Sequence, residues 1–298
     1  MITSFLIALA GYTFLAIVAI LDKLILSKSV KSPSAYAFYS TIFFLVLFLL
    51  APFCAPLLKS YDYVLAIISG LSFGFGLWTM FKALRLGETS HISPFLGGMV
   101  ALSTYGLSWL LLGETLTLTE QLGVILLIIA SLLFSLEKTR RSTGFHRGFI
   151  WAIHSGLLFG IAHVSSKYIY DLYPFLTGLV WTKATAGIVG LIALLMPSVR
   201  MSLKEKDKPT GTATLIISDK VIGIVGVVLI QYAIATGSVT VVNAMAGIQF
   251  ALVFVFAYIL TKTAPKFFTE YFTRRELITQ VIAILLVVIG SALFAITL

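Results

Sequence analysis

The chain has 298 residues, of which 59% are hydrophobic and 11% are charged, and its mean hydropathy is +1.04. An ordinary soluble domain is about 45–50% apolar and about 25% charged. So few charges cannot cover the surface of a soluble globule, whereas a bilayer removes that requirement. Composition therefore excludes an ordinary soluble domain and predicts an all-α membrane protein.

The formal net charge of +9 has a topological meaning in such a chain. In a soluble protein it would suggest nucleic-acid binding, but in membrane proteins Lys and Arg accumulate in cytoplasmic loops. We therefore expect the lipid bilayer as a partner and no nucleic acid. The single cysteine, Cys54, excludes an internal disulfide and a cysteine metal cluster, and we expect a packed free thiol there.

Ten segments have the length and composition of transmembrane helices, and the first is interpreted as a membrane helix rather than a cleaved signal peptide. They are residues 5–25, 36–57, 63–84, 92–112, 121–136, 148–168, 174–199, 221–236, 241–260 and 277–296. The eighth is the shortest because Asp219 and Lys220 precede it; it would begin near Thr212 if these charges pair at the interface. Residues 200–211 are interpreted as a flexible linker and residues 262–276 as an interfacial segment.

The second half of the chain resembles the first. A constant offset of 150 aligns Gly97 with Gly247 and Ala101 with Ala251, and Lys23 ends the first predicted span as Lys167 ends the sixth. The pattern predicts two repeats of five spans, residues 1–137 and 148–298, joined by a basic loop at residues 138–147.

The basic residues give the repeat a direction. Every Lys and Arg except Lys59, Lys167 and Lys183 lies in or beside a loop that follows an odd-numbered span. Because each half has an odd number of spans, the halves must have opposite orientations, which is the inverted-topology repeat typical of secondary transporters. The positive-inside rule then places these loops in the cytoplasm and both termini outside, and we expect the plasma membrane.

One stretch carries a family resemblance. Residues 110–134, LLLGETLTLTEQLGVILLIIASLLF, resemble the end of a repeat of the EamA family: an apolar helix, a Gly-Glu pair, a short polar turn and a last helix. Residues 233–260 resemble the corresponding part of a second repeat, although Thr261-Lys262-Thr263 stands where a Gly-Glu pair is expected.

The EamA family belongs to the drug/metabolite transporter superfamily of ten-helix carriers. The resemblance implies a central substrate cavity between the two halves. Members are often drawn with cytoplasmic termini, in conflict with the charge pattern of this chain, and we follow the charges.

Lys183 is the first candidate site residue. It lies nine residues after Pro174, about 13 Å along a helix, and so near the middle of the seventh span. A charge there is expensive and usually faces a cavity or a partner. Lys183 is interpreted either as a ligand for an anionic or carbonyl group of the substrate, or as a packing residue bonded to helix carbonyls.

Other polar residues within spans are further candidates. The amides of Asn243 and Gln249 must face water or another helix, so they line a cavity or bond between helices. His163 is a candidate proton relay, and His154, nine residues earlier, must lie on the opposite face of the same helix. Aromatic residues that line a cavity, pack in the core or anchor at the interface are Tyr12, Tyr39, Trp78, Tyr105 and Trp181.

Small residues recur at helix-contact spacing, which predicts close and mobile helix packing. The pairs are Gly70 with Gly74, Gly156 with Gly160, and Gly187 with Gly190.

These patterns favour a secondary transporter over an enzyme. No P-loop and no metal-ligand spacing occurs, so we expect neither a cofactor nor a metal. No Asp or Glu lies at the centre of a predicted span, so a coupling proton would need His163, Lys183 or the substrate itself. The predicted function is alternating-access transport of a small organic metabolite, amino-acid-like or an organic anion. A lipid flippase and a membrane-embedded lipid-modifying enzyme stay open, as does the oligomeric state.

Overall fold

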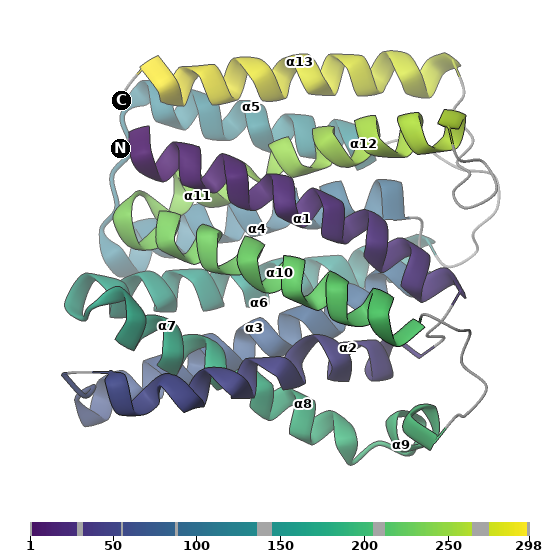
Figure 1. Ribbon diagram of the computed structural model, residues 1–298. Coiled ribbons are helices and arrows are strands. Elements are labelled where there is room, and N and C mark those ends of the chain that lie inside the picture. Colours follow the sequence, from purple (N-terminus) through teal and green to yellow (C-terminus); the bar gives the residue numbers. More distant parts are fainter. Residues whose placement is uncertain are drawn as a thin grey trace.

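The computed structural model describes residues 2–28, 32–54, 56–86, 89–135, 145–204, 212–263 and 274–296. Within these ranges the chain forms helices and no strand, which confirms the all-α prediction. The helices lie side by side in one bundle, with both chain ends at the same edge (Figure 1). We call the end of the bundle at Ile2 and Ile296 the terminal end. The opposite end, at Lys28 and Phe145, is the loop end.

The helices of the first half follow the predicted order. They are α1 (Ile2–Lys28), α2 (Pro33–Thr41), the 3-10 helix η1 (Ile42–Phe53), α3 (Ser60–Leu86), α4 (Thr89–Leu112) and α5 (Leu118–Ser135).

The second half begins with a long helix and contains two interrupted segments. Its helices are α6 (Phe145–Leu172), α7 (Phe175–Ala184), α8 (Gly187–Leu194), α9 (Pro197–Lys204), α10 (Thr212–Thr236), α11 (Val239–Ala244), α12 (Ala246–Thr263) and α13 (Arg274–Ile296).

Nine segments of the described residues are long and apolar enough to cross a membrane, and α5 contains a shorter apolar helix, Leu118–Leu133. The chain therefore has the architecture of a multi-pass membrane protein. Helix α4 ends before Gly113, whose φ of +65° stops the helix. Helix α5 then starts from a capping box, in which Thr117 N–H donates to Glu120 Oε2 at 2.8 Å and Glu120 N–H to Thr117 Oγ1 at 3.3 Å.

Most boundaries shift by a few residues from the predicted ones, and two change more. The short eighth span is wrong: α10 begins at Thr212, and its apolar segment, Thr214–Thr236, includes Asp219 and Lys220. The physical reason is the foreseen ion pair, with Lys220 Nζ 2.6 Å from Asp219 Oδ2. The predicted linker is helical at its start, because α9 extends to Lys204. Residues 205–211 and most of the predicted interfacial segment, residues 264–273, lie outside the described ranges.

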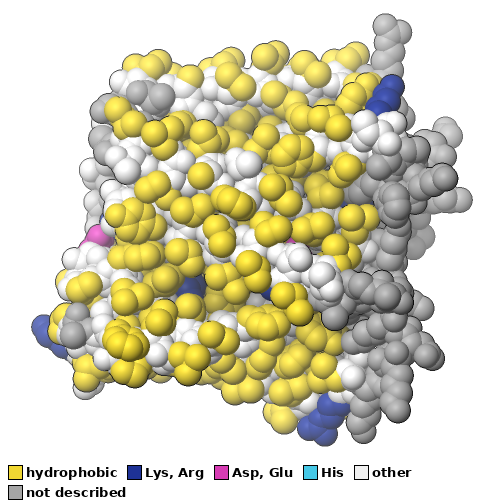
Figure 2. Space-filling model, viewed as in Figure 1, with side chains coloured by type: hydrophobic (Ala, Val, Ile, Leu, Met, Phe, Trp, Pro, Cys, Tyr) yellow, Lys and Arg dark blue, Asp and Glu magenta, His cyan; other side chains and the backbone are white. Residues whose placement is uncertain are grey.

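Large apolar side chains are exposed along the outside of the bundle. Leu49, Phe53 and Leu110 are 72%, 75% and 69% exposed. Figure 2 shows hydrophobic side chains over most of the visible face; the prominent Lys and Arg side chains lie towards the ends of the helices, and only small areas of Lys or Arg show between them. Contiguous apolar surface of this extent is unfavourable in water and fits the hydrocarbon core of a bilayer.

In two spans, Pro33–Phe53 and Phe175–Leu194, the α-helix is interrupted near the middle, at a threonine. Thr41 Oγ1 donates to Ala37 O at 2.8 Å where α2 gives way to η1, and Thr185 Oγ1 donates to Trp181 O at 2.9 Å where α7 ends. Such back-bonding bends helices. Helices α2 and η1 pack against α8 and α7 respectively, so the two interrupted spans run antiparallel.

The core helices pack in pairs. Helix α3 packs on α6 and α1 on α10; α4 packs on α6 and α1 on α12; α5 packs on α13. The predicted glycine contacts are confirmed, since a Cβ on Gly70 or Gly74 would overlap the turn between α7 and α8. Gly156 and Gly160 approach α4 in the same way, and Gly187 and Gly190 approach α2 and η1.

Replacing Gly70 with Ala should lower thermal stability, because the new Cβ would lie 2.8 Å from two backbone atoms, Ala186 N and Thr182 O. Overpacking of this kind costs about 1–3 kcal/mol. The matched control is Gly106→Ala in α4, where a Cβ would meet nothing within 4 Å. Thermal unfolding of the purified variants in detergent measures the difference, and equal melting temperatures would contradict the close helix approach.

Candidate functional site

A cavity of about 230 Å³ lies inside the bundle. On α1 its lining residues run from Tyr12 to Lys23, and on α10 from Asp219 to Gln231. On α3 they run from Phe73 to Leu84. On α3 these residues lie in the half of the helix nearer the loop end, whereas on α1 and α10 they extend past the middle of the helix. The cavity therefore runs from the loop end to just beyond the middle of the bundle.

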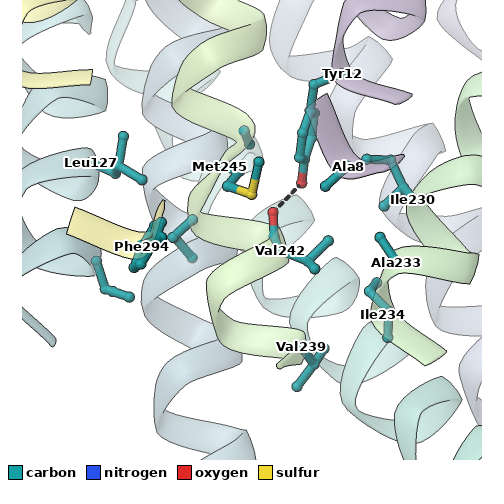
Figure 3. Close-up of a cluster of buried hydrophobic side chains, with 14 of the residues drawn as sticks. Ala8, Tyr12, Leu127, Ile230, Ala233, Ile234, Val239, Val242, Met245 and Phe294 are labelled. Carbon is teal, nitrogen blue, oxygen red and sulfur yellow. Dashed lines mark hydrogen bonds between the residues drawn. The ribbon is translucent and has the colours of Figure 1, made fainter. Parts of the chain in front are cut away.

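An apolar cluster closes the cavity towards the terminal end. It includes Ala8, Ile230, Ile234, Val239 and Met245 (Figure 3). Tyr12 lies between the two regions: its ring belongs to the cluster and also lines the cavity, and its hydroxyl donates to Val242 O at 2.8 Å, as Figure 3 shows. This hydrogen bond joins α1 to α11 and fixes the floor of the cavity.

His163 and Asn243 form a polar pair on the cavity wall. Their side chains meet at 2.6 Å through His163 Nδ1 and Asn243 Oδ1, while Asn243 Nδ2 donates to Val239 O at 2.9 Å. Because the amide nitrogen is used by Val239, the amide oxygen accepts, and this assigns the hydrogen to Nδ1 of His163. The imidazole stacks on Phe159 at 6.1 Å between ring centroids. His154, by contrast, is exposed, as expected for the opposite face of α6.

Two glutamines complete the polar part of the wall. Gln249, a predicted candidate, donates to Leu15 O at 3.4 Å and so links α12 to α1. Gln231 was not predicted; its Oε1 accepts from the Tyr170 hydroxyl at 3.0 Å. Gln231 is 1% exposed, and only its position in an apolar span marked it in the sequence.

Lys183 is fully buried but does not line this cavity. Its Nζ donates to Ser166 Oγ at 3.2 Å and lies 4.5 Å from the centroid of the Phe73 ring, which does line the cavity. Ser166 in turn bonds to Ser69 Oγ at 2.7 Å. In this conformation Lys183 therefore holds α7, α6 and α3 together, one layer behind the wall.

The other predicted aromatic residues lie away from the cavity. Trp181 packs edge-on against Phe48 and Tyr63, and Trp78 stacks on Phe75. Tyr39 packs against Phe38. Tyr105 is half-buried on α4, and its carbonyl accepts from Ser108 Oγ at 3.2 Å. Of the five predicted aromatic residues, Tyr12 alone lines the cavity that the described residues form.

A cluster of charged side chains lies at the loop end of the cavity, and the sequence did not predict it. We call Asp22, Tyr36, Asp219 and Lys220 the acid cluster. Lys220 Nζ lies 2.6 Å from Asp219 Oδ2 and 3.3 Å from Asp22 Oδ1. The Tyr36 hydroxyl contacts both carboxylates. Asp22 and Asp219 lie towards the ends of their spans rather than at the centre, so the structure adds two buried carboxylates to the candidates for proton coupling.

The chain resembles known proteins in its fold but not in its sequence. No protein-family model matches the chain, and no curated protein matches it. Solved structures do match: 29 chains resemble it, among them a crystal structure with a TM-score of 0.67 over 99% of this chain and 97% of that one. The two sequences are 16% identical, so the likeness concerns the fold alone.

Tyr12→Phe should destabilise the floor of the cavity, because it removes the bond to Val242 O while keeping the ring in the apolar cluster. The loss should be roughly 0.5–1.5 kcal/mol. Tyr61→Phe is the control, since Tyr61 is 68% exposed. Thermal unfolding in detergent is the measurement, and an unchanged Tyr12→Phe variant would show that the bond contributes nothing to the closure.

Proposed function

We propose that this chain is a secondary transporter of a small organic metabolite, located in the plasma membrane and working by alternating access. The observation that carries the proposal is a cavity that runs from the loop end to just beyond the middle of the bundle and is bounded towards the terminal end by an apolar cluster. A carrier needs such a state, in which a central site is reached from one side only.

We also propose ten crossings arranged as two inverted five-helix repeats, as in the EamA family. Paired contacts support this arrangement. Gly76 approaches Phe159 across α3 and α6, and Gly226 approaches Leu15 across α10 and α1. The offset of 150 relates the two glycines, and the offset that relates Lys23 to Lys167 relates Leu15 to Phe159.

The two spans that are interrupted at a threonine, α2–η1 and α7–α8, give a second matching pair of interactions, here hydrogen bonds within each span. The same offset that links the two lysines takes Thr41 to Thr185 and Ala37 to Trp181. Both threonines donate to the carbonyl four residues earlier. A twofold relation between α1–η1 and α6–α8 accounts for both bonds, and an interrupted helix is a common feature of transporter substrate sites.

The cavity wall favours a small substrate with both apolar and polar parts. Phe73, Phe159 and Phe250 supply apolar surface, while Asn243 and Gln249 supply amide groups. Binding pockets for small molecules usually combine a mainly apolar wall with a few polar groups, at volumes of about 300–1,000 Å³. The observed volume lies just below that range, which favours an amino-acid-sized metabolite over a lipid.

The function is tested in two steps. Thermal-shift measurements with a panel of small metabolites identify a ligand, since a ligand at about 100 times its Kd stabilises the native state by about 2.7 kcal/mol. Proteoliposomes then report whether that ligand accumulates unchanged inside the vesicles, as a carrier requires. A chemically altered ligand would favour the enzyme alternative. Movement of labelled lipid without ligand uptake would favour the flippase.

The charge distribution predicts that the loop end is cytoplasmic. A cysteine at Thr210, between α9 and α10 in the sequence, should resist an impermeant thiol reagent in intact cells. A cysteine at the exposed Thr115, between α4 and α5 at the terminal end, should react. The opposite labelling pattern would reverse the orientation.

Native Cys54 needs to be removed from this experiment as a source of background. It is 5% exposed, and burial raises the pKa of its thiol, so it should react slowly even when it is present. Cys54→Ser in all variants removes the remaining signal. The Cys54→Ser protein without a new cysteine then serves as the unlabelled control.

We propose that Lys183 becomes a substrate ligand when the terminal side opens. Lys183→Ala should then abolish transport of an anionic ligand per folded molecule, and Lys183→Arg should retain part of that transport because the charge remains. Transport normalised to folded protein decides the matter. Wild-type turnover in Lys183→Ala, combined with lower thermal stability, would restrict this residue to helix packing.

A further inference from the structure

The hydrogen bonds of the acid cluster need one more hydrogen than the Tyr36 hydroxyl and the Lys220 ammonium supply. The Tyr36 hydroxyl contacts Asp22 Oδ1 and lies 3.1 Å from Asp219 Oδ2. Lys220 Nζ also donates to the Tyr36 oxygen, at 2.9 Å. A phenol has one hydrogen to donate. If that hydrogen goes to Asp22, the contact between Tyr36 and Asp219 has no hydrogen unless the Asp219 carboxyl carries one.

The second oxygen of Asp219 is also unsatisfied. Asp219 is 0% exposed and lines the cavity, and its Oδ1 has no hydrogen-bond partner among the described residues. A buried carboxylate oxygen without a partner is costly while the group is charged. A proton on Oδ2 would supply the missing hydrogen to the Tyr36 oxygen. It would also neutralise the carboxylate, so that burying Oδ1 without a hydrogen-bond partner would cost less.

We propose that the acid cluster is a proton-binding site of the cavity, with the proton held on the Asp219 carboxyl. The proposal rests on the proposed transport function, for which this proton would be the coupling ion. A metal cation fits the site poorly, because Lys220 Nζ already occupies the position between the two carboxylates. The proton adds to Asp219 Oδ2 on loading and returns to water on release, with no other bond made or broken.

The proton would connect the site to helix movement. Asp22 belongs to α1, Tyr36 to α2, and Asp219 with Lys220 to α10. The proton completes the bond between α2 and α10, so its release weakens the contact that holds the first part of the interrupted span. The Phe81 ring of α3 packs edge-on against Tyr36 at 4.7 Å and supports the same contact. The other titratable side chains that line the cavity are Tyr12, Lys23 and His163.

Infrared titration of the purified protein tests proton binding without any transport assay. A protonated carboxyl has a carbonyl stretch that a carboxylate lacks, and the wild type should show a buried carboxyl band that is lost as the pH rises. Asp219→Asn, which keeps the size of the side chain, should remove that band. The control is Asp62→Asn in α3, since Asp62 also accepts from a tyrosine, Tyr173, at 2.6 Å but does not line the cavity.

Two further variants test proton binding at the acid cluster if Asp219→Asn fails to fold. Tyr36→Phe removes the hydroxyl and should shift the pH at which the band titrates. Lys220→Gln removes a positive charge beside Asp219 and should move the titration to higher pH, because the charged form loses its nearest counter-ion. A band that is absent from the wild type, or that persists unchanged in all three variants, would overturn the proposal.

Proteoliposomes separate this proposal from the transport function itself. Imposed pH gradients should alter uptake by the wild type and by Asp62→Asn, whereas Asp219→Asn should show equal uptake with and without the gradient. If Asp219→Asn loses the infrared band but wild-type uptake does not respond to the pH gradient, the site binds a proton without coupling it to transport. That result would contradict the coupling. Absence of uptake in every variant, with the band intact, would contradict transport and leave the proton site standing.

Discussion

The hydrocarbon core of a bilayer offers no water to pair with polar groups, so each polar group inside it must find its partner within the protein. The helices satisfy their own backbone, and threonines such as Thr79 and Thr182 bond to carbonyls of their own helix. Other polar side chains bond between helices, as Ser108 does with Thr240 at 2.7 Å. Polar pairs therefore determine which helices meet and at what height, while apolar surface determines that they cross the membrane.

Hydropathy predicts the spans because it needs only local sequence, and it fails where the partner of a charge is distant. Asp219 and Lys220 lower the hydropathy at the start of α10, which made the eighth span look short. Their partners restore the helix: Asp22 and Tyr36 lie 198 and 184 positions from Lys220 in the chain. No local pattern connects residues that far apart, so the acid cluster becomes visible only when α1, α2 and α10 are placed together.

The candidate site was predicted in part for a related reason. Asn243 and Gln249 were identified because burial of an amide without a partner is costly. His163 was identified because a histidine within a span can carry a proton. Aromatic residues gave no such information, since Trp78 and Tyr105 fit equally well in a core, an interface or a cavity. Core helices that are apolar on all sides also lack the periodicity that separates an inner from an outer face. Lys183 was correctly placed within a span, but its position behind Phe73 depends on how α7 rotates against α3.

Under the proposed repeat, the two ends of the bundle have the same geometry but different chemistry. Asp22 corresponds to Ser166 and Asp219 to Ser69, by the offsets that relate the two halves. The serine hydroxyls bond to each other, and Ser166 also accepts from Lys183, while the two carboxylates meet through the Tyr36 hydroxyl. Serine hydroxyls do not titrate near neutral pH, whereas carboxylates do. A scaffold with twofold symmetry would favour neither of its two open states. Carboxylates at only one of these two corresponding positions would make the balance between those states depend on pH.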